Sequence, residues 1–135
     1  MMKRLLPILL MAIPFLFACE RSESKLKAVD RQELEDLMKE IQALANSETC
    51  TDPEEWSFTA VGSKACGGPQ TYIAYPNSID TVKFLALAKE YTAAEDRYNK
   101  KHKIISDCMF VMPPDGVECQ DGKAVLIYNN LQKLE

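Results

Sequence analysis

The chain has 135 residues, with 16 Lys and Arg against 20 Asp and Glu, and 47% of its residues are hydrophobic. This length is typical of one globular domain, and a charged fraction of 27% is too low for a disordered chain. The formal net charge of −4 argues against a nucleic-acid-binding protein, which needs a basic face. The single histidine removes most familiar catalytic and metal-binding arrangements, and the sequence indicates no metal and no cofactor.

The N-terminal residues have the pattern of a secretory signal. A short basic start is followed by an apolar run over residues 5–17. As a helix this run would span about 20 Å, which is shorter than the hydrocarbon core of about 30 Å. Pro7 and Pro14 would weaken it further. We therefore predict a signal peptide over residues 1–18, to be excluded from the fold.

The end of this signal carries a cysteine. Leu16-Phe17-Ala18-Cys19 resembles the lipobox of bacterial lipoproteins, in which the cysteine becomes the mature N-terminus and carries palmitate and other acyl chains. The resemblance implies a lipid anchor at Cys19, because two acyl chains already suffice for stable membrane attachment. Glu20 favours the outer membrane, on its periplasmic side or at the surface. The alternative is an ordinary secretory signal with an incidental thiol at Cys19.

Four cysteines remain when Cys19 is acylated, and an even number in a small exported domain predicts disulfide bonds. A zinc site is disfavoured, because the chain has no Cys-x-x-Cys pair and no nearby histidine. Three pairings are possible. The order along the chain favours Cys50–Cys66 and Cys108–Cys119, since each pair then closes a compact loop.

Residues 19–29 are expected to be the lipidated cysteine and a polar, flexible tether, and residues 30–135 a single domain. Asp30 is the predicted N-cap of the first helix, over residues 30–45, with apolar residues at helical spacing on one face. A loop follows over residues 46–55.

The remaining elements alternate between strands and one long helix. Asp80 is the predicted N-cap of that helix, and Asp121-Gly122 between alternating residues predicts a hairpin turn. The predicted strands cover residues 56–61, 71–75, 104–112, 117–120 and 123–128, and the predicted second helix covers residues 80–101. The sequence thus predicts an α+β fold, with two amphipathic helices on a small antiparallel sheet of four or five strands, joined by two disulfides.

Several segments of the domain resemble small uncharacterised exported bacterial proteins. The resemblance implies a shared fold and no activity. It covers the segment from Trp56 through Cys66-Gly67-Gly68-Pro69 to Tyr75, and then Asp80, Tyr91, Asp107-Cys108 and Val117-Glu118-Cys119.

The loop from Gly62 to Pro69 is the candidate binding site. Three glycines, a proline and a disulfide indicate a constrained exposed loop, which suits a protease or toxin inhibitor because a rigid segment binds with less loss of entropy. Lys64 or Lys64-Ala65 would then enter a trypsin-like pocket. The alternative is that Gly67 and Gly68 only permit a tight turn between two strands.

Other polar and aromatic residues favour structural roles. His102 lies among lysines with no local carboxylate to orient it, which is typical of a solvated helix end. Asp52, Glu54 and Glu55 are typical of a solvated loop beside a proline. Six aromatic residues are expected mainly in the core, with a binding face as the alternative: Trp56, Tyr72, Tyr75, Tyr91, Tyr98 and Tyr128.

These patterns together favour a non-enzymatic binding module, tethered by a lipid to the bacterial cell envelope and binding an envelope protein or a glycan. One alternative is the protease or toxin inhibitor that uses the Gly62–Pro69 loop. The other is a small carboxylate-based hydrolase such as a glycosidase, with Asp52, Glu55 and Asp107 as candidate acids.

Overall fold

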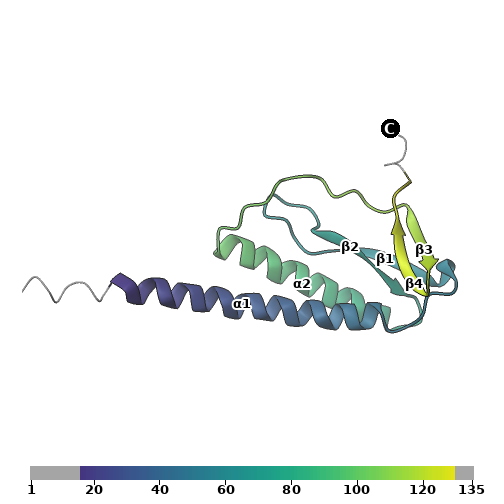
Figure 1. Ribbon diagram of the computed structural model, residues 1–135, viewed down its shortest axis with the longest axis horizontal. Coiled ribbons are helices and arrows are strands. Elements are labelled where there is room, and N and C mark those ends of the chain that lie inside the picture. Colours follow the sequence, from purple (N-terminus) through teal and green to yellow (C-terminus); the bar gives the residue numbers. More distant parts are fainter. Residues whose placement is uncertain (1–15, 130–135) are drawn as a thin grey trace, which may run out of the picture.

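Two helices and two antiparallel hairpins make up residues 16–129, the part of the chain that the computed structural model describes (Figure 1). The predicted signal peptide therefore lies mostly outside the described residues. The elements in chain order are α1 (Leu16–Ala45), η1, a short 3₁₀ helix (Pro53–Glu55), β1 (Trp56–Val61), β2 (Thr71–Pro76), α2 (Thr81–Lys101), β3 (Gly116–Gln120) and β4 (Lys123–Ile127).

Helix α1 is longer than the sequence pattern indicates. It was expected to begin after Asp30, but residues 20–29 are helical as well, so the expectation of a flexible tether there is wrong. Adding a residue to an existing helix costs far less than nucleating one, and this segment is rich in good helix formers. Residues 22–29 are all exposed, and α1 extends past the end of α2 (Figure 1).

Strands β1 and β2 form an antiparallel hairpin in which Trp56 pairs with Pro76 and Val61 with Thr71. Their bounds agree closely with the predicted strands. Helix α2 also begins as predicted, because the Asp80 carboxylate accepts a hydrogen bond of 3.0 Å from the Lys83 backbone N–H. Its C-terminal cap is His102.

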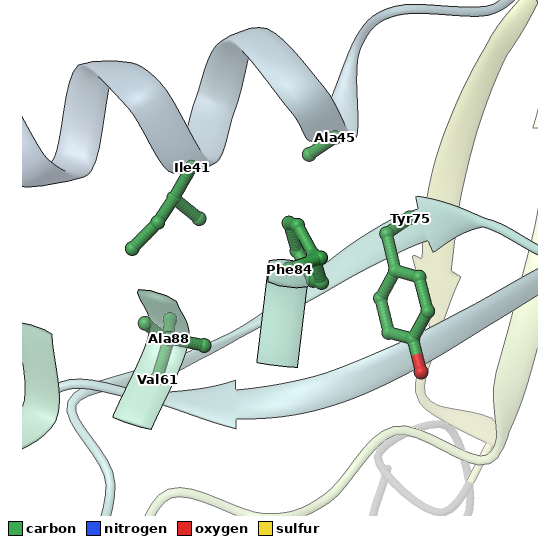
Figure 2. Packing of buried hydrophobic residues seen from close by; sticks show 6 residues of the cluster. All are labelled: Ile41, Ala45, Val61, Tyr75, Phe84 and Ala88. Atoms are coloured by element: carbon green, nitrogen blue, oxygen red, sulfur yellow. The ribbon is translucent and has the colours of Figure 1, made fainter. Parts of the chain in front are cut away.

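The core lies between the two helices and the β1–β2 hairpin. Figure 2 shows Ile41 of α1 and Phe84 of α2 gathered with Val61 and Tyr75 of the strands. Ile41 and Phe84 are fully buried, and the Tyr75 and Phe84 rings lie 4.5 Å apart. Burying such side chains contributes about 1.5–3 kcal/mol each. The predicted apolar faces of both helices therefore position this hairpin.

Strands β3 and β4 form a second hairpin, as Asp121-Gly122 predicts. Asp121 and Gly122 both have positive φ, 52° and 77°, which a two-residue turn of this type requires. The α+β class is confirmed. The strands form two separate two-stranded sheets, β1–β2 and β3–β4, instead of the single sheet that was expected.

The fifth predicted strand, residues 104–112, is not formed. The chain from α2 to β3 runs without regular secondary structure along the side of the domain opposite α1 in Figure 1. Side-chain contacts and a disulfide hold it there, and no strand of the described chain pairs with it. Strand propensity alone does not form a strand, because the backbone needs a neighbour to pair with.

Two disulfides join the four cysteines, as expected, but the favoured pairing of Cys50 with Cys66 and Cys108 with Cys119 is wrong. The bonds join Cys50 to Cys119 and Cys66 to Cys108, so the second is nested within the first. The Cys50 N–H donates to the Gly122 carbonyl at 2.9 Å, which brings the β3–β4 turn back to the end of α1. Chain order suggested compact loops, whereas the return of the chain across the domain decides which thiols meet.

Candidate functional site

A cleft of about 780 Å³ lies between residues 27–42 of α1 and the second half of α2. The loop after β1 and the segment after α2 close its remaining sides. Apolar lining comes from both helices and from the start of the connection to β3, namely Leu34, Met38, Tyr91, Tyr98, Ile104 and Ile105. The charged lining is mixed. Lys27, Arg31 and Lys39 come from α1 together with Glu35, which lies 3.7 Å from Arg31, and Glu95 and Asp107 are acidic side chains of the other elements.

Side chains of α2 fix the loop after β1 at this cleft. Glu95 Oε2 accepts a hydrogen bond of 2.6 Å from the Ser63 N–H, and the Asn99 side chain donates one of 2.7 Å to the Ser63 carbonyl. Thr92 Oγ1 accepts from the Gly62 N–H at 3.0 Å. Gly62 is buried with φ +80°, and an added Cβ would lie 2.6 Å from Glu95 Oε2. Glycine is therefore required where the loop leaves the strand.

Tyr91 belongs to the same hydrogen-bond network as Glu95 and Ser63. Its hydroxyl donates to Glu95 Oε1 at 3.3 Å, and burial, reinforced by the Glu95 charge, raises the pKa of Tyr91 to about 12. The phenol therefore stays neutral at the cleft.

Lys64 does not project into solvent as an inhibitor side chain must. Its ammonium donates to Asp107 Oδ1 and to the Met109 carbonyl, each at 2.7 Å, and its side chain is only 10% exposed. The hydrogen bond from Lys64, with a second from the Met109 N–H, holds the pKa of Asp107 below its usual value. Lys64 therefore fastens the segment after α2 to the loop, and the expected presentation of Lys64 to a protease pocket is wrong.

The Cys66–Cys108 disulfide fastens the same two segments. Both cysteines are exposed, and the Cys66 N–H also donates to Ser106 Oγ at 3.3 Å. Ala65, Gly67 and Gly68 are exposed in this loop, and neither glycine has an atom within 4 Å of an added Cβ. The exposed glycines fit the expectation of a surface turn.

Exposed apolar side chains lie on the segment after α2 that Lys64 and the Cys66–Cys108 disulfide hold in place. We call residues 105–112 the apolar segment. Its exposed fractions are 92% for Ile105, 69% for Met109, 78% for Phe110 and 44% for Met112. The sequence pattern predicts a strand over residues 104–112. The signal in the sequence that disfavours a paired strand is Pro113-Pro114 directly after Met112, because proline has no N–H to donate to a neighbouring strand.

His102 is not at a solvated helix end. Its side chain is only 7% exposed, and Nε2 lies 2.7 Å from Asp30 Oδ2. Lys101 Nζ lies 2.6 Å from the same carboxylate. The hydrogen bonds from Lys101 and then His102 hold the pKa of Asp30 below its usual value. Asp30, expected as an N-cap, thus links α1 to the end of α2.

The three candidate acids of a hydrolase are not brought together. Asp52 accepts from the Glu54 N–H at the start of η1, which includes Glu55 and leads directly into β1. Asp107 is bound to Lys64, beyond the other end of β1. A six-residue strand spans about 20 Å, more than the ~5–9.5 Å that separates paired glycosidase carboxylates.

The aromatic residues proposed as a binding face do not form an exposed one. All six are buried or half-buried, from Trp56 to Tyr128, and Phe110 is the exposed aromatic ring of the apolar segment. Within residues 16–129 there is also no cluster of three or more His, Cys, Asp or Glu suited to a metal ion.

The proposed lipidation site Cys19 lies on α1, with its side chain outside the described part of the chain. Neither helix in the described residues has the length and apolarity needed to span a bilayer.

Comparison with known proteins finds no matching family model, no matching curated protein and no matching solved structure.

Proposed function

We propose that this protein is a non-enzymatic binding module of the bacterial envelope, held in the outer membrane by acyl chains on Cys19. It binds an envelope protein through the apolar segment beside the cleft. The observation that carries this proposal is the exposure of Ile105, Met109 and Phe110 on a segment fastened at both the Cys66–Cys108 disulfide and Lys64.

Exposed apolar side chains in a consecutive run cost solubility unless they serve an interaction. Here the run comprises Met109, Phe110, Val111 and Met112, of which all but Val111 are exposed. Met and Phe are enriched at protein interfaces, and neither offers the hydrogen bonds with which a site holds a glycan. A protein partner therefore fits this surface better than a carbohydrate.

The fastening of the segment supports binding as well. A flexible segment loses about 0.5–1.5 kcal/mol per immobilised side chain on binding, and a segment already held in place loses less. The disulfide to Cys66 and the two hydrogen bonds from Lys64 restrict the backbone next to Phe110 without covering its ring.

Two observations support the proposed location. The lipobox resemblance supplies the anchor, and two disulfides are typical of proteins in an oxidising, exported compartment. The stretch from Cys19 to Asp30 is helical within α1 and spans about 16 Å at 1.5 Å per residue. It would act as a stiff spacer between the membrane and the domain.

Photo-crosslinking in intact cells tests the binding function. A photoreactive amino acid is placed at position 110 or, as the control, at position 82, where Val82 of α2 is equally exposed at 80%. We expect a discrete crosslinked protein from position 110 and none from position 82. The same products from both positions, or none from position 110, would refute the proposal.

Metabolic labelling with a fatty acid tests the anchor separately. The wild-type protein should take up the label and stay with the membrane, and Cys19→Ala should do neither. An unlabelled mature wild-type protein would exclude the lipid anchor.

A further inference from the structure

The backbone of the apolar segment makes few hydrogen bonds to the rest of the described chain. Within the described chain, no backbone–backbone hydrogen bond involves residues 105–112. The Met109 N–H donates to the Asp107 carboxylate, and the Met109 carbonyl accepts from the Lys64 ammonium. The backbone groups of Phe110, Val111 and Met112 have no partner in residues 16–129.

These three residues also have the sequence of a strand. Phe and Val have high β propensity, and the sequence alone predicts a strand over residues 104–112. Their φ values are negative, whereas Cys108 just before them has φ 55°. Pro113 and Pro114 just after them have no N–H. A short potential strand is thus bounded at both ends.

We propose that Phe110–Met112 binds an extended apolar segment of the partner protein by β-strand addition. This inference rests on the proposed function, which places a protein on this surface, and it specifies the recognition chemistry. An extended polypeptide offers alternating N–H and C=O groups for the free backbone and alternating side chains for Phe110 and Met112. A lipid chain supplies none of these hydrogen bonds.

The size of the surface favours a short segment of another protein over a second copy of this chain. The four exposed side chains present on the order of 500 Å², at the upper end for a patch on a monomer. A standard interface buries about 800 Å² per partner. The segment is therefore too small to hold two whole domains together, and it suits a peptide of a few residues.

The charges beside the segment favour an uncharged, apolar peptide. Asp107 is the acidic side chain nearest in sequence, and Lys64 neutralises it at 2.7 Å. A charged residue placed against Phe110 or Met109 would lose hydration without gaining a partner.

The test uses the full-length protein as the cell processes it, purified in detergent. The probe is a fluorescent hexapeptide of alternating Thr and Val, and the matched control is the same peptide with N-methyl groups on alternate residues. N-methylation removes backbone donors and keeps every side chain. Binding is measured by fluorescence anisotropy, and hydrogen exchange reports on the amides of Phe110, Val111 and Met112.

We expect the unmodified peptide to bind with a Kd below about 1 mM and to protect these amides. N-methylation, or Phe110→Ala, should weaken binding by about tenfold or more. Val82→Ala, equally exposed on α2, should leave it unchanged.

Three results would overturn the inference. The first is that the unmodified peptide does not bind at about 1 mM. The second is that both peptides bind equally well. The third is that, without any peptide, the amides of residues 110–112 become more protected as the protein concentration rises. Equal binding would leave the proposed function standing, since apolar contact alone would suffice. The third result would identify a second copy as the occupant. The proposed function itself is tested separately, by the photo-crosslinking experiment at position 110.

Discussion

His102 Nε2 at the C-terminal cap of α2 lies 2.7 Å from Asp30 Oδ2 in the middle of α1, although the two residues are 72 positions apart. Lys101 Nζ lies 2.6 Å from the same oxygen. One carboxylate therefore receives two basic side chains from α2. This contact joins the middle of α1 to the end of α2, next to the cleft.

Asp30→Asn should lower stability at neutral pH, and the loss should shrink in acid. The pKa of Asp30 is lowered from its usual 3.8 by the hydrogen bonds from Lys101 and His102. A carboxylate with a lowered pKa stabilises the fold fully above the unfolded value and loses that effect as the pH falls through the folded value. Urea unfolding, followed by circular dichroism from pH 7 down to below 3.8, measures the difference.

The matched control is Asp36→Asn. Asp36 is on the same helix and 62% exposed, and its partners are the exposed side chains of Lys39 at 3.3 Å and Gln32 at 3.0 Å. Exposed pairs contribute little, so this change should be nearly neutral at every pH. An Asp30→Asn effect that equals the control, or that does not vary with pH, would contradict the proposed contact.

The two disulfides should differ in their rate of reduction. Cys66 and Cys108 are exposed, whereas Cys50 is only 3% exposed. A limiting amount of dithiothreitol in the native protein should therefore reduce Cys66–Cys108 first, because the attacking thiolate needs access to a sulfur atom. Alkylation followed by mass spectrometry identifies the reduced pair.

The same measurement tests the nested pairing. Protease Glu-C cleaves after Glu118 and so separates Cys108 from Cys119, which trypsin leaves on one peptide. Unreduced digests should contain peptides linking Cys50 to Cys119 and Cys66 to Cys108. A peptide linking Cys50 to Cys66 would refute this arrangement.

Gly62→Ala should destabilise the protein more than Gly67→Ala does. Both glycines have positive φ, +80° and +95°, so alanine at either carries about 1–2 kcal/mol of backbone strain. At Gly62 the new Cβ would also lie 2.6 Å from Gln70 Cβ and from Glu95 Oε2, whereas at Gly67 it meets nothing within 4 Å. Chemical unfolding gives both values, and equal losses would show that the loop does not pack on Glu95 as described.

The phenol of Tyr91 should lose its proton only at high pH, and its ionisation should lower the stability of the protein. Its pKa is raised from 10.0 to about 12 by burial and by Glu95. An acid with a raised pKa stabilises the fold below its unfolded value and loses that effect as the pH rises toward the folded value. Absorbance titration should show one tyrosinate forming near pH 12, and Tyr91→Phe should remove it.

Tyr128→Phe is the control for this titration and should leave that late transition in place. Unfolding measurements add a second readout. The wild type should lose stability relative to Tyr91→Phe as the pH rises above 10.0. Parallel behaviour of the two proteins would mean that the phenol is not held neutral at the cleft.

The sequence by itself determined the local elements of this fold. The alternation in β1, the Asp80 cap of α2 and the Asp121-Gly122 turn each act over a few residues, so their structures follow from nearby side chains and backbone angles. The apolar faces of both helices likewise identified the core. These signals sufficed for the α+β class and for the presence of two disulfides.

Only the tertiary structure decided which distant residues meet. Lys64 and Asp107 are 43 positions apart, Asp30 and His102 are 72 apart, and Cys50 and Cys119 are 69 apart. Their contacts arise because α2 packs against α1 and the chain then returns along the β1–β2 hairpin. The structure of the apolar segment is also decided by the tertiary fold. Its strand propensity is local, but pairing needs a neighbouring backbone, and the described fold places none beside it.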